Sequence, residues 1–180
     1  MSFKKYIKEN ELEQAAKDFA IDKHSGQKRK FRNVPYISHP MEVAKTVKEY
    51  GGTSEMIAAA WLHDVLEDVK NITVQDIIDN FGDKVANLVV ELTNKENIKG
   101  PEKGQYLLDK MLTMSDDALT IKLADRLNNV SDFETAPPTF IAKYKPQTEL
   151  ILSGLTKRSL NKTHQKLIDN IKEIIIKYET

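Results

Sequence analysis

The chain has 180 residues, 40% of them hydrophobic and 30% charged, which suits a globular protein that buries one core and excludes a disordered chain. Its 27 basic and 27 acidic residues give no net charge, which argues against a protein that binds the nucleic-acid backbone. The absence of cysteine excludes disulfides, thiolate nucleophiles and cysteine-bound metals, so any metal ion must be held by histidine and carboxylate side chains.

The hydropathy pattern predicts a cytoplasmic protein. No window approaches the roughly 18 apolar residues of a membrane span, and the start, MSFKKYIKENELEQ, lacks the apolar core of a signal peptide. We therefore expect neither a membrane nor a nucleic acid among the partners. The oligomeric state is left open, with a homo-oligomer as one alternative.

Apolar residues recur mostly at spacings of three and four, and glycine and proline are scarce, so helices are predicted throughout. In chain order they run from about Glu11 to His24, from Pro40 to Gly51, from Thr53 or Ser54 through EMIAAAWLHDVLED, after Thr73, from Gly82 to Leu92, from Glu102 to Met114, from Asp117 to Phe133, from Pro137 to Leu155, and from Ser159 to Tyr178. SGQKRKFRNVPYIS and NKENIKGPEKG are predicted loops. The expected fold class is all-α, a compact single-domain helical bundle over residues 1–180.

Three helix starts carry local signals. Asn10, with Glu13 three residues later, is a predicted cap of the first helix. Pro40 suits the first position of the second helix because its φ angle is already helical. Thr73, with an aspartate three residues later, marks the short fourth helix.

The segment AAAWLHDVLED places charged residues in an apolar run. A buried carboxylate is costly unless it is paired or bound to a metal. Helical spacing puts His63 four residues before Glu67 and Asp64 four residues before Asp68, so one side of the helix would present a histidine and three acids. Such a cluster repels itself without a cation. The alternative is an exposed acidic helix end.

Two further segments supply matching side chains. In LTIKLADRLNNV, Asp125 lies in an apolar run with Asn129 one turn further on the same face; the alternative is that Asp125 pairs with Arg126 or caps a neighbouring helix. In PYISHP, His39 precedes a proline-initiated helix, and the alternative is a surface or capping histidine.

Taken together, His39, His63, Asp64 and Asp125 form a set of two imidazoles and two carboxylates, with positions left for water and substrate. This donor set favours Mn, Fe or Co over Mg and Zn. A bound ion lowers the pKa of water and offsets phosphoryl charge. One turn beyond the ligands, Glu67 and Asp68 are candidates to orient or deprotonate that water; the alternative is pairing with a nearby cation such as Lys70.

The loop KHSGQKRKFR is strongly basic and leads into His39. Its charge could receive phosphates, and an arginine can stack on a base; the alternative is a solvated loop. The basic residues are Lys23, Lys28, Arg29, Lys30 and Arg32. His24 and His164 lack acidic partners at metal spacing, Trp61 is expected in the core, and Tyr36 fits either core or pocket wall.

The segments GQKRKFRNVPYISHP, AAAWLHDVLED and LTIKLADRLNN, in this order, resemble the hydrolase domain of RelA/SpoT-type enzymes within the HD superfamily. The resemblance covers about residues 11–133, and less specifically the C-terminal helices at about 137–178. It implies an all-helical HD domain that removes the 3′-pyrophosphate of the alarmone (p)ppGpp, usually with Mn2+. The chain leaves no room for a synthetase domain, so a stand-alone hydrolase is expected.

The resemblance also assigns roles to individual residues. It implies that His39, His63, Asp64 and Asp125 bind the metal and that Glu67 and Asp68 activate water. By the same resemblance, Arg29 would lie against the guanine and Asn129 near the sugar or phosphates. Lys30 is a further predicted substrate-binding residue because it lies in the same basic loop.

Some positions depart from the long bacterial enzymes, which usually have His where Asn128 stands and Thr where Asp132 stands. These departures bear on guanine recognition and leave alternative functions open. One alternative is hydrolysis of another nucleotide, such as NADPH, a deoxynucleotide or a nucleoside monophosphate. Another is a non-catalytic nucleotide sensor.

Overall fold

The computed structural model describes residues 9–95, 98, 100 and 102–178. The helices are α1 (Glu9–Lys23), α2 (Ser38–Glu49), α3 (Ser54–Leu62), α4 (Val65–Asp68), α5 (Val74–Phe81), α6 (Asp83–Leu92), α7 (Glu102–Thr113), α8 (Asp116–Ser131), α9 (Pro138–Gly154) and α10 (Lys162–Ile175), with 3-10 turns at Asp132–Glu134, Leu155–Lys157 and Ile176–Tyr178. Within the described ranges, pairing of β type is limited to one bridge between Lys28 and Pro35. The all-α prediction is confirmed.

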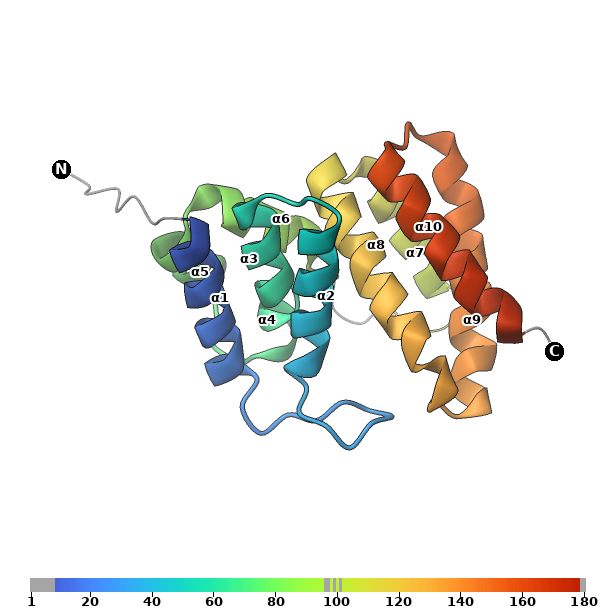
Figure 1. The fold of residues 1–180 in the computed structure, drawn as a ribbon, viewed down its shortest axis with the longest axis horizontal. Helices are drawn as coiled ribbons and strands as arrows, with labels where there is room; N and C mark the ends of the chain where they lie inside the picture. Colours follow the sequence, from blue (N-terminus) through green and yellow to red (C-terminus); the bar gives the residue numbers. More distant parts are fainter. Residues whose placement is uncertain (1–8, 96–97, 99, 101, 179–180) are drawn as a thin grey trace.

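The helices form two halves that meet along α2 and α8 (Figure 1). In the N-terminal half, α3 packs against α1, α2 and α6, and α5 packs against α6. In the C-terminal half, α8 packs against α10 and α7 packs against α9. Helix α2 joins the halves because it contacts both α3 and α8. The three helices at this junction are the ones whose segments carry the predicted metal ligands.

Helix α3 is the buried centre of the N-terminal half. Ala58, Ala59 and Ala60 expose no surface, and these small side chains let the surrounding helices approach closely. Trp61 and Leu62 are also buried, so the prediction that Trp61 belongs to the core is confirmed. Because Met56–Leu62 are all buried, the end of α3 lies in the core where the chain reaches His63.

Several helix starts follow from side chains a few residues away. Thr73 and Asp76 mark the start of α5 as predicted, and they form a capping box in which each side chain accepts from the backbone N–H of the other. The Thr53 hydroxyl accepts a hydrogen bond from the Met56 N–H at 3.3 Å and so begins α3. These bounds are local properties of the sequence, which is why they could be predicted.

Two predicted starts are wrong in detail. Asn10 lies inside α1 rather than capping it. Helix α2 begins at Ser38, two residues before Pro40. Proline is tolerated throughout a first turn, where backbone N–H groups have no helical partner, so it does not fix the first residue.

The starts of two helices in the second half of the chain can also be compared with the prediction. The last helix begins at Lys162 instead of Ser159, because Asn161 caps it by accepting from the His164 N–H at 2.9 Å. Part of the predicted loop NKENIKGPEKG falls outside the described residues. Helix α7 begins at Glu102, as predicted, within the last residues of that segment.

The predicted continuous helix through EMIAAAWLHDVLED is also wrong, because α3 ends at Leu62 and a separate short helix, α4, begins at Val65. The His63 ring donates from Nδ1 to the Ala60 carbonyl at 2.8 Å, giving a partner to a carbonyl at the helix end. The φ angle of Asp64 is −102°, away from the helical value. The His-Asp pair therefore sits at a corner between two helices.

Candidate metal centre

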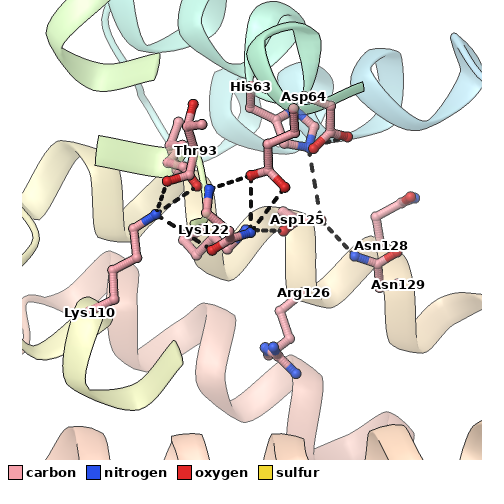
Figure 2. A network of polar contacts seen from close by, with 12 residues as sticks. His63, Asp64, Thr93, Lys110, Lys122, Asp125, Arg126, Asn128 and Asn129 are labelled. Atoms are coloured by element: carbon pink, nitrogen blue, oxygen red, sulfur yellow. Dashed lines mark hydrogen bonds and ion pairs between the residues drawn. The ribbon is translucent and has the colours of Figure 1, made fainter. Parts of the chain in front are cut away.

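The structure brings the four predicted ligands together at the junction of the two halves. His39 is the second residue of α2, His63 and Asp64 form the corner between α3 and α4, and Asp125 lies in the middle of α8. His39, His63 and Asp125 are buried, and Asp64 is half-buried. Figure 2 shows His63 and Asp64 reaching toward Asp125 from the opposite side of the site.

The separations between donor atoms suit a single ion. Nitrogen and oxygen ligands bind such metals at about 2.0–2.2 Å, which places neighbouring donors about 3 Å apart in octahedral geometry. The Nε2 atoms of His39 and His63 are 3.2 Å apart. Asp125 Oδ1 lies 3.2 Å and 3.9 Å from these two nitrogens, and Asp64 Oδ2 lies 3.6 Å and 3.0 Å from them. Donor atoms of His39, His63 and Asp125 all fall within 4.8 Å of one another.

The hydrogen bonds of the two histidines direct a lone pair from each toward this point. His63 donates from Nδ1 to the Ala60 carbonyl, and His39 donates from Nδ1 to the Asn128 side-chain oxygen at 2.6 Å. In the neutral imidazoles the proton is therefore on Nδ1 and the lone pair is on Nε2. Without a metal, a proton on one of the two Nε2 atoms makes their 3.2 Å contact a hydrogen bond. With that proton displaced, both lone pairs can bind one cation, so the donor chemistry fits a metal.

Neighbouring charges shift the pKa values of the candidate ligands. Burial lowers the pKa of His63, but the negative charges of Asp64 and Asp125 outweigh burial and raise that pKa to about 9. Burial raises the pKa of Asp125, but Lys122 and His39 outweigh burial, so this pKa lies well below its usual value. Because a metal must displace the histidine protons, its binding weakens as the pH falls.

Two residues outside the predicted set also support the ligands. The Tyr36 hydroxyl donates to Asp64 Oδ2 at 2.5 Å, which places Tyr36 on the site rather than in the apolar core. Lys122 is not among the predicted site residues, but it is buried and its Nζ lies 3.0 Å from Asp125 Oδ2. A lysine in the apolar run LTIKLAD, three residues before a buried aspartate, is the signal that could have identified it.

Both members of the predicted water-activating pair lie in α4 and are exposed. Glu67 Oε1 accepts hydrogen bonds from the Asn94 backbone N–H at 2.5 Å and from the Asn94 side chain at 3.0 Å. Partial removal from water and the charge of Asp64 raise the pKa of the Asp68 carboxyl. The pair thus borders the donor cluster, and its role in water activation stays a prediction.

The predicted substrate residues divide into two kinds. Lys30 is exposed in the loop between α1 and α2. Arg29 instead crosses to α8, where its Nη2 donates to Asn129 Oδ1 at 2.9 Å and its Nε pairs with Asp132 Oδ2 at 2.9 Å. Asn129 in turn donates to Asp125 Oδ1 at 2.6 Å. The structure therefore connects Arg29 and Asn129 to the metal ligands, and substrate contact by these residues stays a prediction.

The remaining histidines have structural surroundings, as expected. His24 is buried, with Nδ1 bonded to the Gln27 side chain at 2.8 Å and its ring against Tyr36. His164 is buried at the start of α10 and lies 3.0 Å from the Thr120 hydroxyl.

Among the described residues, no helix has the length and apolar character needed to cross a membrane.

Comparisons with known proteins show the family to which the chain belongs. A family model described as "HD domain" matches residues 16–159. The mouse protein "Guanosine-3′,5′-bis(diphosphate) 3′-pyrophosphohydrolase MESH1" is 31% identical over 88% of this chain and 90% of its own length. An Aquifex aeolicus protein, "Guanosine-3′,5′-bis(diphosphate) 3′-pyrophosphohydrolase", is 42% identical over 65% of this chain and 17% of its own length. A solved structure titled "A metazoan ortholog of SpoT hydrolyzes ppGpp and plays a role in starvation responses" superposes with a TM-score of 0.81 at 25% identity, covering 93% of this chain and 95% of that one.

Proposed function

Because this chain belongs to the HD domain family, we propose that it is a metal-dependent hydrolase that removes the 3′-pyrophosphate of ppGpp and pppGpp. The observation that carries the proposal is the convergence of two imidazole and two carboxylate donors at the junction of α2, α3 and α8. Relatives that cover most of the chain are named for this reaction. The substrate is therefore a small nucleotide.

The reaction is a hydrolysis at phosphorus. A water oxygen bonds to the phosphorus attached to the ribose 3′ oxygen, the bond from that phosphorus to the 3′ oxygen breaks, and the 3′ oxygen takes up a proton. The divalent ion of the family, when bound, lowers the pKa of water and offsets negative charge on the phosphoryl group. Mn2+ is the ion we propose, since mixed imidazole and carboxylate donors suit it.

The roles of the chain's own residues follow from their positions. His39, His63, Asp64 and Asp125 would hold the ion, with Nε2 of each imidazole and one oxygen of each carboxylate facing it. Lys122 holds the second oxygen of Asp125 and keeps that carboxylate charged. A cytoplasmic location and a homo-oligomeric state stay predictions.

The water-activating role falls to the exposed pair on α4. Three hydrogen bonds from Asn94 hold Glu67, two to Oε1 and a longer one of 3.4 Å to Oε2. Oε2 is therefore the less strongly held oxygen, and we assign it to the water or its proton. Asp68 lies beside it, and the raised pKa of its carboxyl makes it a better proton acceptor than an ordinary aspartate, as long as the pH stays above that pKa.

The proposal is tested by product analysis. The purified protein is incubated with Mn2+ and, separately, ppGpp, pppGpp, NADPH and common nucleotides, and the products are separated by anion-exchange chromatography. We expect ppGpp to yield GDP and pyrophosphate, and the Asp64→Ala variant to yield neither. Turnover of a different nucleotide alone would move the protein to another substrate. Metal binding without any turnover would instead favour the sensor.

Replacing Glu67 with glutamine is expected to lower kcat for ppGpp about 10²- to 10⁴-fold, the usual contribution of a positioned acid or base. The affinity for Mn2+ should change little, because Glu67 is bonded to Asn94 and is not among the converging donors. Steady-state kinetics and a Mn2+ titration measure the two effects. The control is Glu149→Gln, an exposed glutamate on α9 that pairs with Lys145. An unchanged kcat in the Glu67 variant would remove it from the reaction.

A further inference from the structure

Asn128 lies between a metal ligand and the basic loop that precedes α2. Its side-chain oxygen accepts a hydrogen bond from His39 Nδ1 at 2.6 Å and another from Arg29 Nη2 at 3.2 Å. The three residues come from α8, α2 and the loop between α1 and α2. Asn128 thus connects two parts of the chain that are about 90 to 100 residues away from it in sequence.

The chemistry of arginine fixes how this amide is oriented. A guanidinium has only hydrogen-bond donors, so the Asn128 atom that faces Arg29 must be the oxygen. The same oxygen is then the partner of His39 Nδ1, and that nitrogen must donate. As a result, Nε2 is the ring nitrogen of His39 that is free to bind a metal.

Arg29 also orients a second amide, that of Asn129, which contacts the candidate ligand Asp125. Its Nη2 also donates to Asn129 Oδ1 at 2.9 Å, which leaves the Asn129 amide nitrogen to donate to Asp125 Oδ1 at 2.6 Å. A single guanidinium therefore orients two neighbouring amides, and each amide contacts one metal ligand. Figure 2 shows both asparagines on the same side of Asp125, opposite Lys122 and Lys110 in this view.

The position of Arg29 is itself fixed by Asp132. The Asp132 carboxylate is almost fully buried and pairs with Arg29 Nε at 2.9 Å through one oxygen. Its other oxygen pairs with Arg32 Nε at 2.8 Å. The guanidinium of Arg29 therefore joins Asn128 to Asp132.

From this geometry we infer that Asn128, held by Arg29 and Asp132, is a positioning residue that fixes His39 as a metal ligand through Nε2. The inference rests on the proposed function, since it requires a metal at His39. Arg29 therefore has a role in the metal centre before any substrate arrives. Outer hydrogen-bond partners of metal-binding histidines usually contribute about 10- to 100-fold to metal affinity.

The test measures Mn2+ affinity without substrate, from the electron paramagnetic resonance signal of free Mn2+. Asn128→Leu keeps the size of the side chain but removes the acceptor, and we expect it to raise the Mn2+ dissociation constant about 10- to 100-fold. Asn128→Asp keeps an acceptor for His39 and should bind at least as tightly as the natural protein. Asn80→Leu is the matched control, because Asn80 is exposed on α5 and its side chain donates to the Asp76 carbonyl of the same helix.

A second pair of variants tests Arg29 without altering α8. Arg29→Met should weaken Mn2+ binding several-fold, since both amides lose the donor that orients them. Arg32→Met is the control, because Arg32 shares the Asp132 carboxylate and contacts neither amide. Circular dichroism of the metal-free variants establishes that each one folds.

The outcomes separate the inference from the proposed function. Unchanged Mn2+ affinity in Asn128→Leu, or equal weakening in Asn128→Leu and Asn128→Asp, would overturn the role of Asn128. Unchanged affinity in Arg29→Met would leave Arg29 as a substrate residue only and overturn its part in the inference. A natural protein that binds no divalent metal would remove the proposed function, and the inference with it.

Discussion

Replacing Asp125 with asparagine is expected to lower kcat/KM for ppGpp by at least about 10³-fold, because the proposed site would lose a charged ligand for the ion that activates water. Asp125 Oδ1 is part of the converging donor set, and the other oxygen pairs with buried Lys122. Initial rates with saturating Mn2+, together with a Mn2+ titration, measure the loss. Asp79→Asn, an exposed aspartate on α5 bonded to Gln75, is the matched control.

The same substitution also leaves Lys122 without its anionic partner. Breaking a buried ion pair by removing one partner usually costs about 3–5 kcal/mol. A loss of activity could then reflect a loss of folded protein. The double variant Lys122→Met with Asp125→Asn separates the two causes, because methionine fills a similar volume without charge. We expect this double variant to recover most of the free energy of unfolding and none of the activity.

Urea denaturation of the single and double variants, followed by circular dichroism, provides the stability measurement. The double variant binding Mn2+ and hydrolysing ppGpp at the natural rate would show that Asp125 is a structural residue rather than a ligand. A single variant as stable as the natural protein would show that the pair with Lys122 contributes little to folding.

Replacing Leu119 with alanine is expected to lower the free energy of unfolding by about 2–5 kcal/mol. Leu119 exposes no surface and lies in the buried stretch of α8, which packs against α2, α3, α6 and α10. Truncation therefore removes apolar contacts and leaves a cavity in the core. For a chain of this length, the melting temperature should fall by roughly 2–4 °C for each kcal/mol lost.

Leu150→Ala is the matched control for this prediction. The substitution is chemically identical, but Leu150 lies on α9 and is 40% exposed, so the loss should stay below about 1 kcal/mol. Urea denaturation at one temperature compares the two variants directly. Equal losses at the two positions would contradict the central place assigned to α8 in the core.

The sequence by itself determined the helices and most of their bounds. Apolar residues at spacings of three and four predict helices because each turn brings such positions to the same side. The starts at Thr53 and Thr73 were predictable because a capping side chain reaches only two or three residues along the chain. The motifs around His39, His63-Asp64 and Asp125 likewise pointed to four donors, which the structure brings together. That residues 1–180 form one domain stays a prediction.

Only the tertiary structure decided what surrounds these donors. The bonds from Arg29 to Asp132 and from His39 to Asn128 join residues 103 and 89 positions apart, and the packing of α2 against α8 brings them into contact. No spacing in the sequence encodes such a pair, because a side chain's local neighbours lie within about four residues. The corner at His63-Asp64 was also a tertiary outcome. A helical pattern continues through that corner in sequence, whereas the folded chain ends α3 there and directs the two side chains toward α8.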